Sequence, residues 1–150
     1  MENNNILIRE MTDSDIEKVC RIEKEAFSDA WDFESFRYTV KAKHDYSIVA
    51  ESDGEIEGYA ILRTSFDTAD IINIAVDKEN RQKGIAGKLM QKLLSYGDST
   101  GVISYMLEVR EHNTAALRLY LKFCFEIIGV RENYYSNPVE NAFVMKRKIM

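Results

Sequence analysis

Residues 81–90 read RQKGIAGKLM and stand between an apolar stretch and a run with helical periodicity. The segment contains two glycines and three basic residues. A helix N-terminus exposes about four unpaired N–H groups and a partial positive charge, and small residues let an anion approach them. The segment therefore predicts an anion site on backbone amides at the start of a helix.

Two familiar nucleotide-binding loops do not fit this segment. A Walker A loop needs G-x-x-x-x-G-K-[ST], but Gly84 and Gly87 are too close together, and Leu89 rather than a hydroxyl residue follows Lys88. A Rossmann fingerprint needs G-x-G-x-x-G, which this segment lacks. What remains is the pattern R-x-x-G-x-A over residues 81–86, directly after a strand-like segment that ends in IAVD.

The hydrophobic periodicity predicts alternating strands and helices in the order β-α-α-β-β-β-α-β-α-β-β. The expected strands are 5–9, 46–51, 56–66, 70–76, 103–109, 125–133 and 142–148, and the expected helices are about 12–27, 33–40, about 85–100 and 115–123. Strands joined by short turns must be antiparallel, whereas the strands that flank helix 85–100 should be parallel through a right-handed crossover. The fold class is therefore α+β (mixed α/β), with one sheet covered by helices.

The size and composition predict one domain over residues 1–150. A net charge of −5 argues against a nucleic-acid partner. The two cysteines match no metal or redox spacing, and unpaired cysteines fit a reducing cytosol. No window reaches the roughly 18 apolar residues of a membrane span. We therefore expect a cytoplasmic protein that binds no metal, no nucleic acid and no membrane.

A longer pattern follows in residues 107–135, LEVREHNTAALRLYLKFCFEIIGVRENYY. Together with the R-x-x-G-x-A loop, this segment resembles the GNAT N-acetyltransferases of the RimI type, the ribosomal-protein-alanine N-acetyltransferases. Their pattern is close to LEVR-x-x-N-x-x-A-x-x-LY-x-x-x-GF-x-x-x-G-x-R-x-NYY. The resemblance covers most of the chain and implies a GNAT fold. That fold has a mixed, mostly antiparallel seven-stranded sheet with about four flanking helices, splayed between strands 70–76 and 103–109.

The resemblance also implies that acetyl-CoA is the cosubstrate and that no metal takes part. Loop amides would hold the CoA pyrophosphate, and the free backbone of strand 70–76 would hold the pantetheine arm. A bulge in that strand would leave an N–H for the thioester carbonyl. The residues expected to bind acetyl-CoA are Ile74, Ala75, Val76, Arg81, Lys83, Gly84, Ile85, Ala86, Gly87, Lys88, Asn113 and Tyr120.

Two residues are expected to carry the chemistry. Strand alternation turns Glu108 away from the side of Leu107 and Val109, so its carboxylate need not be buried. A weak base is enough for an α-amine, whose pKa is roughly 7.7–8.0 against roughly 10.4 for lysine. The resemblance makes Glu108 the general base and Tyr120 the acid for the departing thiolate. From the residues alone, Glu108 is equally an ordinary surface glutamate, Tyr120 a core aromatic, and Asn113 a helix N-cap.

The acceptor side is predicted from loop aromatics, which could instead be hydrophobic loop anchors. These residues are Trp31, Phe33, Tyr134 and Tyr135. An acidic cluster nearby either attracts a basic ribosomal protein or simply faces solvent; it comprises Glu23, Glu25, Asp29, Asp32 and Glu34. The resemblance implies acetylation of the α-amine of a ribosomal protein that begins with alanine, by direct attack in a ternary complex. A small amine, a lysine side chain and a non-catalytic acetyl-CoA-binding module remain alternatives. We expect a monomer or weak dimer.

The chain departs from the RimI pattern at two places. Cys124 stands where glycine usually ends the helix in a left-handed conformation. Either cysteine adopts that conformation at a cost of roughly 1 kcal/mol, or the helix ends differently. Ala30 precedes Trp31 where proline is common, which loosens the comparison of the acceptor loop.

Overall fold

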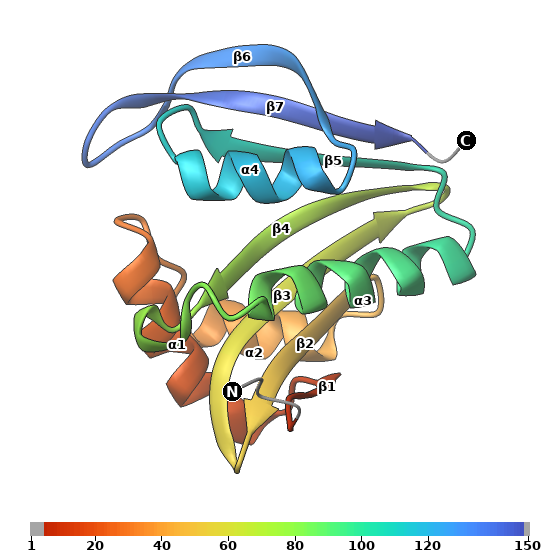
Figure 1. The fold of residues 1–150 in the computed structure, drawn as a ribbon. Helices are drawn as coiled ribbons and strands as arrows, with labels where there is room; N and C mark the ends of the chain where they lie inside the picture. Colours follow the sequence, from red (N-terminus) through yellow and green to blue (C-terminus); the bar gives the residue numbers. More distant parts are fainter. Residues whose placement is uncertain (1–4, 149–150) are drawn as a thin grey trace.

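The computed structural model describes residues 5–148 and contains the predicted order of strands and helices (Figure 1). The strands are β1 (Leu7–Glu10), β2 (Asp45–Ser52), β3 (Glu55–Ser65), β4 (Thr68–Val76), β5 (Ser104–Arg110), β6 (Glu126–Tyr135) and β7 (Glu140–Lys148). The helices are α1 (Ile16–Ala26), α2 (Phe33–Lys41), α3 (Ile85–Ser99) and α4 (Thr114–Lys122), and 3₁₀ turns cover Asp13–Asp15 and Lys78–Asn80. The predicted boundaries lie within four residues of the observed ones, and several coincide with them. The largest error is the start of the first helix, because the residues after Thr12 form a 3₁₀ turn before α1 begins.

The seven strands form one sheet in the order β1-β2-β3-β4-β5-β7-β6. Only β4 and β5 are parallel, as the crossover through α3 predicts, and every other neighbouring pair is antiparallel. Helices α3 and α4 cover one face, whereas α1 and α2 cover the other (Figure 1). The predicted mixed sheet with flanking helices is therefore confirmed. None of the helices in residues 5–148 is long and apolar enough to cross a membrane.

The predicted splay between β4 and β5 is present. The two strands pair only from Thr68 to Asp70 with Ser104 to Met106, and they share no further ladder pair in the described chain. Figure 1 shows them close together at one end of the sheet and apart at the other. A bulge marks the divergence, because Ile71 pairs with Leu62 and Asn73 with Ile61, which leaves Ile72 between them unpaired. A bulge bends and twists its strand, so it helps to turn β4 away from β5.

Apolar packing against α3 holds the sheet in place at one end of the splay. On the face of α3 and α4, the fully buried Leu89, Met90 and Leu93 of α3 pack against the sheet. At the end where β4 and β5 stay together, Tyr105 of β5 donates its hydroxyl to Leu94 O at 3.0 Å and to Asp98 at 2.6 Å. The splay is therefore anchored at one end by α3 and open at the other.

Helix α4 ends in a left-handed residue, which confirms the first of the two expectations for Cys124. Its φ is 71°, its N–H donates to Leu121 O at 3.0 Å, and the N–H of Phe125 donates to Tyr120 O at 3.0 Å. These two bonds are the Schellman pattern, in which the residue after the left-handed position packs back on the last turn. The rings of Phe125 and Tyr120 accordingly lie 6.0 Å apart. The family pattern is kept here without its glycine.

Replacing Cys124 by glycine is expected to stabilise the protein. The left-handed conformation costs a side chain roughly 1–2 kcal/mol, and the extra freedom of glycine in the unfolded chain returns about 0.5–1 kcal/mol. Urea unfolding should show a gain of about 0.5–1 kcal/mol for Cys124→Gly. Cys124→Ala is the matched control, because it removes the exposed thiol but keeps the Cβ atom. An equal gain in both variants would contradict this account.

Candidate active site

The glycine-rich loop forms the N-terminus of α3 with free backbone amides. Gly84 is the N-cap residue at φ 80° and ψ 9°, and the first helical bond runs from Lys88 N to Gly84 O at 3.1 Å. The amides of Ile85, Ala86 and Gly87 therefore have no partner within the helix. A Cβ atom at Gly84 or Gly87 would meet nothing within 4 Å, so the surface above these amides is open. This arrangement meets the requirements of an anion site.

The side chains around this loop have different tasks. Arg81 donates from Nε to Val76 O at 3.1 Å, and Lys83 donates to Asn80 Oδ1 at 3.1 Å, so both fix the path of the loop. Lys88 is exposed on the first turn of α3, where its charge faces solvent. The side chain of Ile85 is 1% exposed and belongs to the core, so only its amide is open to a ligand.

The end of β4 offers one free backbone edge. Ile74, Ala75 and Val76 pair with β3 on one side, opposite Ala60, Tyr59 and Gly58. Their other edge faces the splay, because β5 has already diverged. Backbone groups on such an edge need partners from elsewhere, which an extended amide-containing ligand could provide.

Glu108 on β5 points away from Leu107 and Val109, as the alternation predicts. Leu107 and Val109 are 2% and 5% exposed on the side of α3 and α4, whereas the Glu108 side chain is 33% exposed on the opposite side. Its Oε2 accepts a hydrogen bond from Arg131 Nε at 3.2 Å, across β7. The carboxylate is thus oriented and still reachable from solvent.

Tyr120 lies on the other face of the same region. Its side chain is 7% exposed within the core of α3 and α4, and burial raises the pKa of its phenol above the ordinary value. Its hydroxyl has no hydrogen-bond partner among residues 5–148. The phenol therefore keeps its proton at neutral pH and has it free to donate. The core interpretation of Tyr120 is therefore confirmed, and its role as the acid stays a prediction.

Tyr135 interacts electrostatically with both Glu108 and Tyr120. Burial, followed by the charges of Tyr134 and Glu108, raises the pKa of Tyr135 to about 12, and Tyr135 in turn raises the pKa of Tyr120. One predicted acceptor residue thus interacts electrostatically with both the predicted base and the predicted acid.

Asn113 caps α4, because its Oδ1 accepts a hydrogen bond from Ala116 N at 3.2 Å. The N-cap interpretation is therefore confirmed. The capping bond occupies the oxygen alone, so the exposed Nδ2 remains available to a ligand. Its contact with CoA stays a prediction.

The aromatic residues of the acceptor side differ in their environment. Trp31 is half-buried, with its ring 5.2 Å from that of Phe36. Tyr134 is 51% exposed and lies edge-on to Tyr135 at 5.0 Å. Phe33 remains 45% exposed at the first position of α2. The structure therefore supports loop anchoring for Trp31 and leaves Phe33 and Tyr134 open to contact.

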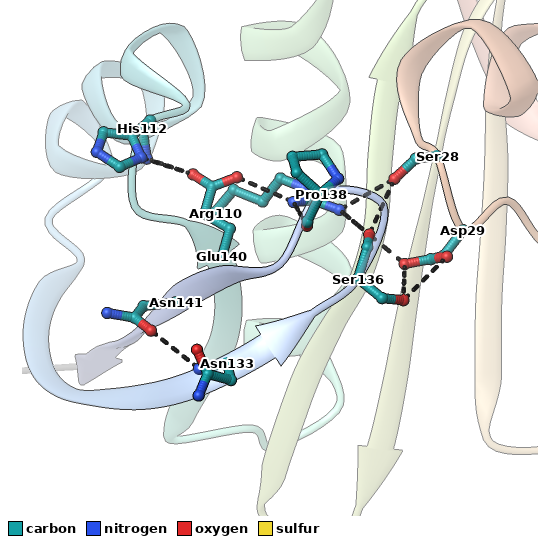
Figure 2. Close-up of polar contacts among 9 residues, drawn as sticks. All are labelled: Ser28, Asp29, Arg110, His112, Asn133, Ser136, Pro138, Glu140 and Asn141. Atoms are coloured by element: carbon teal, nitrogen blue, oxygen red, sulfur yellow. Dashed lines mark hydrogen bonds and ion pairs between the residues drawn. The ribbon is translucent and has the colours of Figure 1, made fainter.

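A bridge between two loops was missed by the sequence analysis (Figure 2). Arg110, two residues beyond Glu108, donates to Ser28 Oγ at 3.0 Å, Ser136 O at 2.9 Å, Pro138 O at 3.1 Å and Glu140 Oε1 at 2.9 Å. Its guanidinium also lies 4.4 Å from the centre of the Tyr135 ring. The loop between α1 and α2 is thereby linked to the loop between β6 and β7. Alternation places Arg110 on the Glu108 face, which was the one available signal.

Four of the five residues of the predicted acidic cluster are exposed, which supports the interpretation that they face solvent. Asp29 accepts hydrogen bonds from Ser136 and Asn137 within the bridge, and Asp32 caps α2 by accepting from Ser35 N at 2.9 Å. Glu23 is 2% exposed. These acidic residues are neighbours in sequence, but α1 ends and α2 begins between them, so their side chains point in different directions. Asp29 and Asp32 remain exposed despite these bonds, as do Glu25 and Glu34.

Metal ligation finds no support in the described chain. Among residues 5–148, no group of three or more His, Cys, Asp or Glu side chains could hold a metal ion. The polar groups described above are instead the Glu108 carboxylate, the Tyr120 phenol and the backbone amides at the start of α3. These groups suit proton transfer and carbonyl polarisation.

The sheet is splayed between two parallel strands, with free amides on one side and an accessible carboxylate on the other. This arrangement indicates an N-acetyltransferase. The chain belongs to the acetyltransferase (GNAT) family, whose model matches residues 16–125. Within this family, the putative ribosomal protein bS18-alanine N-acetyltransferase of Bacillus subtilis (strain 168) is 32% identical over 92% of this chain and 92% of its own length. The resemblance to the RimI type is therefore confirmed.

Solved structures agree with this assignment. The ribosomal-protein-S18-alanine N-acetyltransferase from Escherichia coli superposes with a TM-score of 0.88 at 27% identity, covering 96% of this chain and 94% of that one. Ard1 from Thermoplasma volcanium gives a TM-score of 0.90 at 30% identity, covering 97% and 99%. The match extends over both halves of the splayed sheet.

Proposed function

We propose that the protein transfers the acetyl group of acetyl-CoA to the N-terminal α-amine of a ribosomal protein that begins with alanine. The relatives from Bacillus subtilis and Escherichia coli carry this activity in their names, and enzymes of the family use acetyl-CoA. The observation that supports it best is the splay itself, because β4 stops pairing with β5 after Asp70 and leaves a free backbone edge beside the strand that carries Glu108. An amine and a thioester can then meet between the strands from two directions.

The donor would be held mainly by backbone groups. The free amides at the start of α3, from Gly84 to Gly87, would take the pyrophosphate, with the nearby basic side chains at the rim. The free edge of Ile74 to Val76 would take the pantetheine arm, and Asn113 Nδ2 is available to it. Acetyl-CoA supplies the thioester carbonyl, and the bulge at Ile72 offers a backbone donor to polarise that carbonyl.

The reaction proceeds by direct attack in a ternary complex. The amine nitrogen bonds to the carbonyl carbon, and the carbon–sulfur bond breaks as the tetrahedral intermediate collapses. The amine proton passes to Glu108, directly or through a water, and the proton of Tyr120 passes to the departing thiolate. No acetyl group is attached to the protein at any stage.

The acceptor would lie between the two loops that Arg110 links. Tyr134 and Tyr135 from one side and Trp31 and Phe33 from the other would contact its first residues. The proposed setting is the cytoplasm, with the protein as a monomer or weak dimer.

Thiol release across a panel of peptides tests the proposal. Acetyl-CoA with peptides that start with alanine should give rapid release, and the same peptides with a blocked N-terminus should give none. Release from blocked peptides that contain lysine, or from small amines alone, would instead support the alternative acceptors. A stable acetyl mark on the protein after incubation with acetyl-CoA alone would contradict direct attack.

A further inference from the structure

The strongest feature outside the proposed chemistry is a buried carboxylate with four hydrogen bonds. Glu23, in the last turn of α1, accepts a bond from Trp31 N at 2.9 Å. It accepts two from Asn73 Nδ2, at 3.1 and 3.3 Å, and one from the hydroxyl of Tyr59. The partners come from the acceptor loop, β4 and β3.

This carboxylate is costly to bury. It is 2% exposed, and each of its four bonds comes from a neutral donor rather than a cation. Burial accordingly raises the pKa of Glu23, against the opposing effect of those hydrogen bonds. An apolar side chain would fill such a site at lower cost in free energy. Stability alone therefore does not explain a glutamate here.

Two of the partners of Glu23 belong to the two parts of the proposed site, the donor strand and the acceptor loop. Asn73 is the first residue of β4 after the bulge, three positions beyond the last pair with β5. It begins the free edge that is available to the donor. Trp31 stands in the loop between α1 and α2, which is one wall of the proposed acceptor site. One carboxylate thus connects the donor strand with the acceptor loop.

We infer that Glu23 is a positioning residue that sets the separation between the donor strand at Asn73 and the acceptor loop at Trp31. The inference rests on the proposed function, because it assigns donor and acceptor to these two parts. Glu23 touches neither substrate. It acts by fixing where the amine stands relative to the thioester, and a misplacement of about 1 Å in such a geometry can cost up to about 10²-fold in rate.

Glutamine at position 23 should loosen this connection. Donors face both carboxylate oxygens, so the amide group of glutamine meets either the Trp31 N–H or the donors of Asn73 and Tyr59. We expect Glu23→Gln to lower kcat/KM for an alanine-initiated peptide by about tenfold, mainly through kcat, with acetyl-CoA affinity within about threefold of wild type. Steady-state thiol release and equilibrium acetyl-CoA binding measure the two quantities.

Two further variants separate positioning from stability. Glu25→Gln makes the same chemical change on the exposed face of α1 and should leave all parameters unchanged. Tyr59→Phe removes one buried bond of the same carboxylate but leaves both parts joined, so kcat/KM should stay within about threefold. If Tyr59→Phe loses as much activity as Glu23→Gln, the effect is one of core stability and the inference is wrong.

A compensating change gives a direct test of the connection. In Glu23→Gln with Asn73→Asp, the carboxylate moves to β4, the glutamine amide donates to it, and the glutamine oxygen accepts from Trp31 N. Activity should recover at least threefold relative to Glu23→Gln, on the scale of about 1 kcal/mol for one restored hydrogen bond. No recovery would overturn the inference.

Hydrogen exchange tests the connection without turnover. If Glu23→Gln is too unstable for kinetics, Asn73→Ala can replace it, because this variant removes only the hydrogen bonds between Glu23 and β4. Exchange in both residues 27–32 and residues 73–76 should quicken in either variant. Faster exchange in only one segment, or in neither, would contradict the inference. If both segments respond but wild type acetylates no peptide, the proposed function fails and the connection stands.

Discussion

Glu108→Gln is expected to lower kcat for acetylation of an alanine-initiated peptide by about 10³-fold, within the range for a general base. The amine binds largely as an ammonium ion at neutral pH, because its pKa is roughly 7.7–8.0. Attack on the thioester requires the free amine, and in the wild type the carboxylate of Glu108 accepts the proton. Glutamine fills the same space on β5 and can accept no proton, so acetyl-CoA affinity should not change.

The pH dependence of the variant gives the clearest signature. Without the base, only peptide molecules that have already lost their proton can react, so the rate of Glu108→Gln should rise about tenfold per pH unit up to pH of about 8. The deficit relative to wild type should therefore shrink as pH increases. Glu126→Gln, an exposed glutamate on β6, is the matched control and should behave as wild type. A deficit that is constant with pH would point to a role for Glu108 in binding rather than in proton transfer.

Local patterns predicted the parts of the site that depend on neighbours in sequence. The glycines and basic residues of 81–90 predicted the start of α3, and alternation placed Glu108 opposite the core side chains on β5. These features follow from backbone conformation within a few residues. The splay itself came from the family resemblance, because nothing in the strand sequences shows where pairing stops.

Contacts between distant segments could not be predicted in the same way. Arg110 lies 82 residues from Ser28, and Glu23 lies 50 residues from Asn73. Glu23 was grouped with surface acids because its neighbours in sequence are acidic, although its helical position turns it into the core. Spacing along the chain carries information about one helix or strand, whereas these contacts depend on how α1 packs on the sheet.

Tyr120→Phe is expected to lower kcat by about 10²-fold, with KM for acetyl-CoA within about threefold of wild type, since loss of a general acid costs at least this much. The thiol of CoA has a pKa of roughly 8.5. Without an acid to protonate the departing thiolate, the tetrahedral intermediate can expel the amine instead and return to the reactants. The Tyr120 phenol has no competing partner among residues 5–148, and its raised pKa keeps the proton in place until the carbon–sulfur bond breaks. Phenylalanine keeps the packing against Phe125 and removes only the proton.

The order of events makes this prediction separable from that for Glu108. Loss of the acid slows collapse of the tetrahedral intermediate toward product, so raising the pH cannot rescue Tyr120→Phe as it rescues Glu108→Gln. Tyr134→Phe, which removes an exposed phenol from the same end of the splay, is the control and should keep kcat within about threefold if Tyr134 acts only in acceptor contact. Unfolding in urea should give Tyr120→Phe the stability of wild type, because its hydroxyl contributes no hydrogen bond to the described fold. A kcat within threefold of wild type would mean that water protonates the thiolate, and that Tyr120 is a core residue alone.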